Sequence, residues 1–166
     1  MSSLDLQTME RLVRRSIALA AEARAAGQHP FGALVADATG RILIEAANTV
    51  ADDRDPTAHA ETNVVRRACA AFDRASLADA VLVTSTEPCP MCAGAIFWSG
   101  IGTVVFALGA TAFYDLVEGE LPGGDRLRVS AADILRCGNH TVTLLGPMLE
   151  DEASVPHRGY WGSLAD

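Results

Sequence analysis

The sequence contains no lysine, and all 13 of its basic residues are arginine. Schiff-base chemistry through a lysine amine is therefore excluded. The sequence also lacks a long apolar run, since none approaches the ~20 residues of a membrane-spanning helix. Its N-terminal stretch mixes acidic residues and arginines with apolar ones, unlike a signal peptide. We therefore expect a cytoplasmic protein.

Positive charge is scarce as well, because the formal net charge is −8 and the pI is about 4.9. Binding to phosphate backbones depends on clustered cations, so this balance disfavours a nucleic-acid partner. It leaves a small neutral molecule open as the substrate. The four cysteines are too few for a disulfide scaffold. Two of them, Cys89 and Cys92, form a Cys-x-x-Cys pair, which in a cytosolic protein indicates metal or redox chemistry.

The hydrophobic pattern predicts a single domain over residues 1–166, with residues 146–166 as a C-terminal tail or lid. A hairpin is followed by alternating strands and helices, which is typical of an α/β fold with three α/β/α layers and a central, mixed five-stranded sheet. Residues 108–129 are predicted to be irregular. The expected helices cover about 5–26, 58–72, 91–99 and 130–136, and the expected strands 33–36, 42–44, 81–84, 103–107 and 141–145.

Two short motifs carry the chemistry, His59-Ala60-Glu61 and Pro88-Cys89-Pro90-Met91-Cys92. Imidazole nitrogen and thiolate sulfur are preferred ligands of Zn²⁺, and a catalytic zinc site uses three protein ligands and leaves the fourth position to water. His59, Cys89 and Cys92 are therefore the predicted ligands. The 26 residues between the motifs, 62–87, leave room for the rest of one helix and one strand. Both motifs are thus expected at the starts of consecutive helices.

Glu61 is the predicted catalytic residue. Bound zinc lowers the pKa of its water to ~7 and so provides hydroxide for attack, and Glu61 would act as the proton shuttle. An ideal helix would turn His59 and Glu61 well apart, so we expect a tight first turn that lets the Glu61 side chain reach the water. The order His-x-Glu and then Pro-Cys-x-x-Cys is the signature of zinc deaminases.

Two other interpretations of these residues stay open. A closed, structural zinc site would need a fourth ligand, for which Cys137, His29, His140 and His157 are available. A redox dithiol would use Cys89 and Cys92, but it would explain neither His59 nor Glu61.

With these motifs, the chain resembles the cytidine deaminase superfamily of zinc-dependent nucleobase and nucleoside deaminases, and is most similar to bacterial guanine deaminases. The similar strings run over 30–33, 55–61 and 87–98, with Asn48 between the first two. The resemblance implies an aminohydrolase that acts on guanine, in purine metabolism, and assembles as a homodimer. It also implies four substrate contacts, namely Asn48 to the ring, the backbone N–H of Ala60 to a carbonyl, and Phe31 and Trp98 beside the base.

Three of these contacts have a simpler interpretation, since Phe31 and Trp98 could be core residues and Asn48 a turn residue. The similarity weakens after Ala107, where Asp115 or Glu118 is the candidate to replace an acidic pair of the guanine deaminases. The tail over 160–166 is similar, more loosely, to the closing tail of fungal-type cytosine deaminases.

Three competing functions follow. The first is deamination of a free base or related heterocycle, with guanine favoured and cytosine, a triazine or a nucleoside as alternatives. The second is a tRNA adenosine deaminase, which the lack of arginine over 114–124 disfavours. The third is a zinc module without activity, which would have no use for Glu61.

Overall fold

A five-stranded sheet lies at the centre of the computed structural model, which describes residues 4–164. The strand order is β2-β1-β3-β4-β5. β1 pairs antiparallel with β2 and β3, whereas β3, β4 and β5 run parallel. The prediction of a mixed five-stranded sheet is confirmed. The strands are β1 Gly32–Ala36, β2 Ile42–Ala47, β3 Val81–Thr86, β4 Thr103–Leu108 and β5 Thr143–Leu145.

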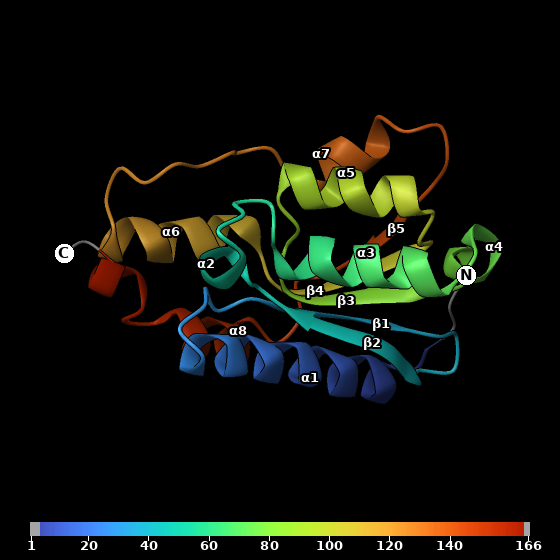
Figure 1. Cartoon of the computed structure of the whole chain (residues 1–166), viewed down its shortest axis with the longest axis horizontal. Helices are drawn as coiled ribbons and strands as arrows, with labels where there is room; N and C mark the ends of the chain where they lie inside the picture. Colours follow the sequence, from blue (N-terminus) through green and yellow to red (C-terminus); the bar gives the residue numbers. More distant parts are fainter. Residues whose placement is uncertain (1–3, 165–166) are drawn as a thin grey trace.

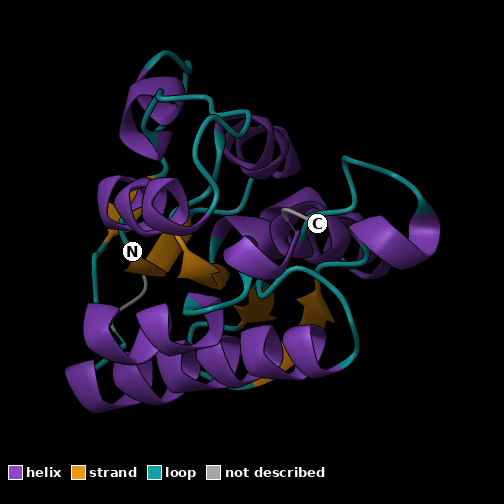
Figure 2. Cartoon of the chain, turned by 90° about the vertical axis from the view of Figure 1, so that its left-hand side faces the viewer, coloured by secondary structure: helices purple, strands orange, loops and turns teal. Residues whose placement is uncertain are grey.

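Helices cover both faces of this sheet, as Figure 1 shows. α1 and α8 pack on one face, and α3, α5 and α7 pack on the other. Figure 2, turned by 90°, shows the strands between these two helical layers. The predicted three-layer α/β/α arrangement is therefore present. The bounds are α1 Leu6–Ala25, α3 Ala60–Ala71, α5 Pro90–Ser99, α7 Ala131–Arg136 and α8 Glu150–Ser154.

The central strands are apolar because both of their faces are covered. Successive side chains of a strand point to opposite faces, so each strand serves two cores. On β1, Ala33 and Val35 belong to the core under α3 and α5, whereas Leu34 and Ala36 belong to the core under α1. Every residue of β1, β3 and β4 is buried.

α1 approaches the sheet most closely at Gly32. A Cβ at this position would lie 2.5 Å from the Leu19 Cβ and 2.5 Å from the Ser16 carbonyl oxygen. Glycine is therefore required for helix–strand packing directly beside Phe31.

The segment 108–129, predicted to be irregular, contains a helix, and that prediction was wrong. α6 (Ala110–Glu120) has one buried residue, Val117. It packs against the C-terminal tail, and its Phe113 side chain also packs against the core under α1. The short segments α2 (Val50–Asp53), α4 (Arg74–Ala78), η1 (Val155–His157) and η2 (Trp161–Leu164) complete the chain. No helix within residues 4–164 is long and apolar enough to cross a membrane.

Candidate metal centre and active site

Two helix starts meet at the carboxyl end of β3. His59 is the N-cap residue of α3 and Cys89 is the N-cap residue of α5, each with extended backbone. Cys92 is the third residue of α5. Side chains at the N-cap and third positions lie on the same side of a helix start, which is why they so often cap together. The Cys-x-x-Cys spacing therefore turns both sulfurs toward His59.

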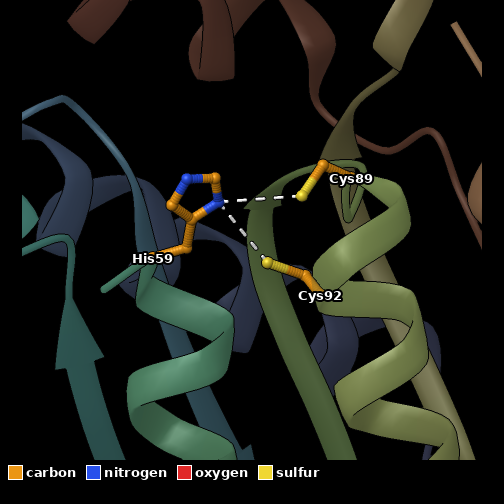
Figure 3. A group of neighbouring side chains, drawn as sticks. All are labelled: His59, Cys89 and Cys92. Carbon is orange, nitrogen blue, oxygen red and sulfur yellow. Dashed lines mark hydrogen bonds between the residues drawn. The ribbon is translucent and has the colours of Figure 1, made fainter. Parts of the chain in front are cut away.

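The three side chains converge on one point, as Figure 3 shows. The His59 Nδ1 lies 3.7 Å from the Cys89 Sγ and 3.5 Å from the Cys92 Sγ. All three ligand atoms lie within 4.8 Å of one another. Two thiols and one imidazole at these separations fit a zinc ion bound at about 2.0–2.3 Å from each ligand atom. The sequence predicted this grouping.

The three ligands hold their protons differently. Hydrogen bonds from Cys92 and from His59 lower the pKa of the Cys89 thiol to about 4. The hydrogen bond to Cys89 raises the pKa of His59, and the hydrogen bond to Cys89 together with burial raises the pKa of Cys92. Cys89 is therefore the ligand that most readily forms a thiolate. Metal binding must displace a proton from His59 and from Cys92.

Glu61 lies beside the ligands, almost fully buried. Its Oε2 is 3.6 Å from the Cys92 Sγ, and its Oε1 accepts a hydrogen bond of 3.0 Å from the Thr84 hydroxyl on β3. Burial raises the pKa of this carboxyl group. A carboxyl group with a raised pKa is better suited to accept a proton and return it during a reaction.

The expectation of a tight first helical turn was wrong. His59 lies outside the helix, with φ −70° and ψ 155°, and α3 begins at Ala60. The angle that separates neighbours in an ideal helix does not apply across this junction, so His59 and Glu61 face the same cavity without any tightening of the turn.

A cavity of about 310 Å³ opens next to the ligands. Of the predicted site residues, Phe31, Asn48, His59, Glu61 and Cys89 line it. Its remaining walls come from the end of β3, α6, the 121–129 loop and the tail. Another hollow of about 440 Å³ lies over α7 and β5 and is lined by none of the metal ligands. The chemistry therefore belongs to the smaller cavity.

Asn48 lines the cavity and also holds a turn, so its contact with the substrate ring stays a prediction. Its Oδ1 accepts a hydrogen bond of 3.1 Å from the Val50 N–H and shapes the turn after β2. With the oxygen engaged, the Nδ2 hydrogens are the part of the amide left to face the cavity. Asn48 is 1% exposed, so the structure places a buried donor there.

The structure separates Trp98 from the other predicted substrate contacts. Trp98 is 78% exposed and does not line the cavity within one chain. Neither the core interpretation nor a contact with the base in the same subunit fits this position. Ala60 is the first residue of α3, directly after His59, but it is fully buried and is not among the residues that line the cavity. Its N–H has no acceptor within the helix, and a contact with the substrate stays a prediction.

Sequence reasoning missed much of the outer wall of the cavity. Phe113 and Tyr114 come from α6, and their clustering in a chain with 5% aromatic residues was a signal that could have been used. His29 and Arg126 gave no such signal. Asp115 and Glu118, the candidates for an acidic pair, do not line the cavity. Glu118 instead forms an ion pair with Arg126.

The C-terminal tail closes one side of the cavity with Trp161. The indole stacks on the His29 ring, with centroids 5.5 Å apart and planes at 14°, and lies 5.7 Å from the Phe113 ring. The Glu120 carboxylate accepts hydrogen bonds from the backbone N–H groups of three tail residues, Gly159, Trp161 and Gly162. The tail therefore borders the cavity through Trp161, its role as a lid stays a prediction, and residues 165–166 lie outside the described range.

None of the four candidates for a fourth protein ligand belongs to the group formed by His59, Cys89 and Cys92. Cys137 is exposed, and His140 stacks on Phe97. His157 is buried against Thr86, and His29 bonds Tyr160. Within residues 4–164, the group of histidine, cysteine and acidic residues suited to a metal contains His59, Cys89 and Cys92 and no fourth member. A closed structural site is therefore not supported, and neither is a redox pair, because His59 joins the two sulfurs.

Comparison with known proteins gives the same picture. Residues 6–108 match the family model of the cytidine and deoxycytidylate deaminase zinc-binding region. A probable cytosine deaminase of Schizosaccharomyces pombe is 40% identical over 97% of this chain and 98% of its own length. A guanine deaminase of Bacillus subtilis is 43% identical over 59% of this chain and 63% of its own. The solved guanine deaminase of Nitrosomonas europaea superposes with a TM-score of 0.70 at 29% identity, over 90% of this chain and 82% of that one.

Proposed function

We propose that this chain, which belongs to the cytidine and deoxycytidylate deaminase zinc-binding family, deaminates a free nucleobase, with guanine as the first candidate. It is a zinc-dependent nucleobase deaminase. One observation carries the proposal, namely the buried Glu61 carboxylate beside the three metal ligands in a cavity with aromatic walls. A purely structural metal site has no need of such a group.

His59, Cys89 and Cys92 would hold the zinc ion. When bound, zinc supplies Lewis acidity that makes water a nucleophile near neutral pH. Glu61 accepts a proton from the attacking water and delivers it to the ring nitrogen next to the carbon under attack. It then takes the remaining proton from the newly added hydroxyl group and passes it to the departing amino group, so that a C=O bond forms, one C–N bond breaks and ammonia leaves. Thr84 holds the Glu61 carboxylate in place through the 3.0 Å hydrogen bond.

The cavity favours a flat, uncharged ring. Phe31 and Phe113 provide apolar ring surface, and the Asn48 amide provides a donor to a ring edge. The Ala60 N–H at the start of α3, which has no acceptor within the helix, would donate to an oxo group. Trp161 and the tail cover the base and limit the access of bulk water during the reaction.

Cytosine is the second candidate, and a specific observation favours it. The S. pombe relative is similar over 97% of this chain, including the tail and α6, whereas the B. subtilis guanine deaminase is similar over 59%. The segments that form the outer wall of the cavity are therefore shared with the former.

An ammonia-release screen with zinc-loaded protein tests the proposal. The panel contains guanine, cytosine, adenine, a triazine, the matching nucleosides and a tRNA transcript. We expect release from a free base that carries an oxo group, and none from tRNA. Release from tRNA alone, or from no member of the panel, would contradict the proposal.

We further propose that the chain forms a homodimer through the outer face of α5. Trp98 is exposed there, although Ile96 and Phe97 of the same helix pack inward. A contact between Trp98 and a base therefore requires a second subunit. Sedimentation analysis should show a dimer that Trp98→Ser weakens, and a monomer at all concentrations would contradict the interface.

A further inference from the structure

Most polar side chains around the cavity already have partners. The Tyr114 hydroxyl donates to the Leu127 carbonyl oxygen at 3.2 Å. The two Glu87 oxygens accept from the N–H groups of Ala110 and Ala131 at 2.9 and 3.0 Å, and so cap α6 and α7. Asp125 lines the mouth of the cavity but is exposed, so water can solvate it.

Two nitrogen donors in the same cavity wall have no partner. The Nε1 of Trp161 and the Nε of Arg126 are buried, and no hydrogen-bond partner for either atom exists in the described part of the chain. Trp161 is 8% exposed, and the Arg126 side chain is 10% exposed. Buried polar groups are nearly always hydrogen-bonded, so two exceptions in one cavity call for an explanation.

Both donors belong to side chains that the surrounding structure holds in place. Trp161 is held by the hydrogen bonds to Glu120 and by stacking on His29. The Arg24 guanidinium also bonds two carbonyl oxygens earlier in the tail, at 2.9 and 2.8 Å. The Arg126 Nη1 pairs with Glu118, and its Nη2 donates to the Leu121 carbonyl oxygen at 3.2 Å. Nε is the one guanidinium nitrogen that has no partner in the described part of the chain. Both donors are therefore preorganised.

We propose that Trp161 Nε1 and Arg126 Nε donate hydrogen bonds to acceptor atoms of the substrate base. These two donors would select bases that carry an oxo group or an unprotonated ring nitrogen on the edge away from the reacting amino group. The inference rests on the proposed function and deepens it. Indole and guanidinium nitrogens donate and never accept. An amino group or a C–H on that edge would leave both donors buried and unpaired, which is an effective way to reject a base.

Paired substrates that differ by one oxo group test the proposal. The pairs are guanine with 2-aminopurine and cytosine with 4-aminopyrimidine, and the measured quantity is the ratio of kcat/KM within a pair. The variants are Trp161→Phe, which keeps the ring and loses the N–H, and Arg126→Lys, which keeps the charge and loses Nε. Arg41→Lys is the control, since Arg41 is 75% exposed and pairs with Asp37 on the surface.

We expect each variant to reduce the preference for the oxo base by about tenfold, mainly through the oxo member of the pair. The control should keep the wild-type ratio. An equal fall in kcat/KM for both members of a pair would show that the substitution disturbed the structure and did not change selectivity, which contradicts the proposal for that residue. An unchanged ratio in both variants would overturn the proposal.

Equilibrium binding separates this proposal from the proposed function. The four bases are titrated calorimetrically into zinc-loaded Glu61→Gln protein, with and without Trp161→Phe. Tighter binding of oxo bases that Trp161→Phe removes supports the donor assignment, even if the wild type releases no ammonia. Equal binding of oxo and deoxo bases, or binding of none, overturns it.

Discussion

Replacing Glu61 with glutamine removes the proposed proton shuttle and changes little else. The amide has the same shape, and its oxygen can still accept the hydrogen bond of 3.0 Å from Thr84. His59, Cys89 and Cys92 are untouched, so the variant should retain its zinc. The only function lost is proton transfer.

The size of the effect follows from that single loss. General acid–base catalysis by a positioned side chain contributes roughly 10²–10⁴-fold, or about 3–5 kcal/mol of the activation barrier. We expect kcat to fall by that factor. The fold should not lose stability, because burial disfavours the charged form of Glu61 and the amide carries no charge.

The assay combines three measurements on one preparation, namely ammonia release, zinc content and thermal melting. Glu10→Gln on the surface of α1 is the matched control and should behave as the wild type. Near wild-type activity of Glu61→Gln with zinc in place would refute the assignment of the shuttle. Loss of zinc together with activity would show that Glu61 is part of the metal site.

Three further predictions concern the fold around the site. Gly32→Ala should lower the free energy of unfolding in urea by about 1–3 kcal/mol, because its Cβ would lie 2.5 Å from the Leu19 Cβ; an unchanged midpoint would contradict the close packing. Glu120→Gln should raise KM more than it lowers kcat and speed proteolysis of the tail, because the amide replaces a charged acceptor of three N–H groups; equal proteolysis would refute the clamp. Burial lowers the pKa of His157 from 6.5 to about 4, so the unfolded chain binds the extra proton between these values and stability falls as the pH drops from 6.5 toward 4, by up to roughly 3 kcal/mol. Urea unfolding at pH 5 and pH 7 should therefore differ less for His157→Gln than for the wild type, and an equal difference would contradict this.

The sequence predicted the parts of the molecule that face the core or the metal. Strands buried on both faces, such as β3 and β4, appear as apolar runs, and helices that cover them carry an apolar stripe. The metal ligands were visible because zinc demands particular side chains at particular spacings. These constraints act over short stretches of sequence.

The outer wall of the cavity was not predictable in the same way. α6 packs against the tail and lines the cavity, and its short apolar stripe of Phe113, Val117 and Leu121 is interrupted by acidic residues and a glycine. Arg126 and Trp161 lie 35 positions apart and meet the same cavity only after folding. The orientation of the Asn48 amide depends on the N–H of Val50 in the turn. The proposed selectivity thus depends on contacts between residues that lie far apart in the sequence.

The coordination of the metal decides whether this account holds. X-ray absorption at the zinc edge, combined with metal analysis, should give one zinc per chain with two sulfurs, one imidazole nitrogen and one oxygen from water. A third sulfur, a second imidazole or a protein carboxylate in place of that oxygen would close the site and contradict a deaminase.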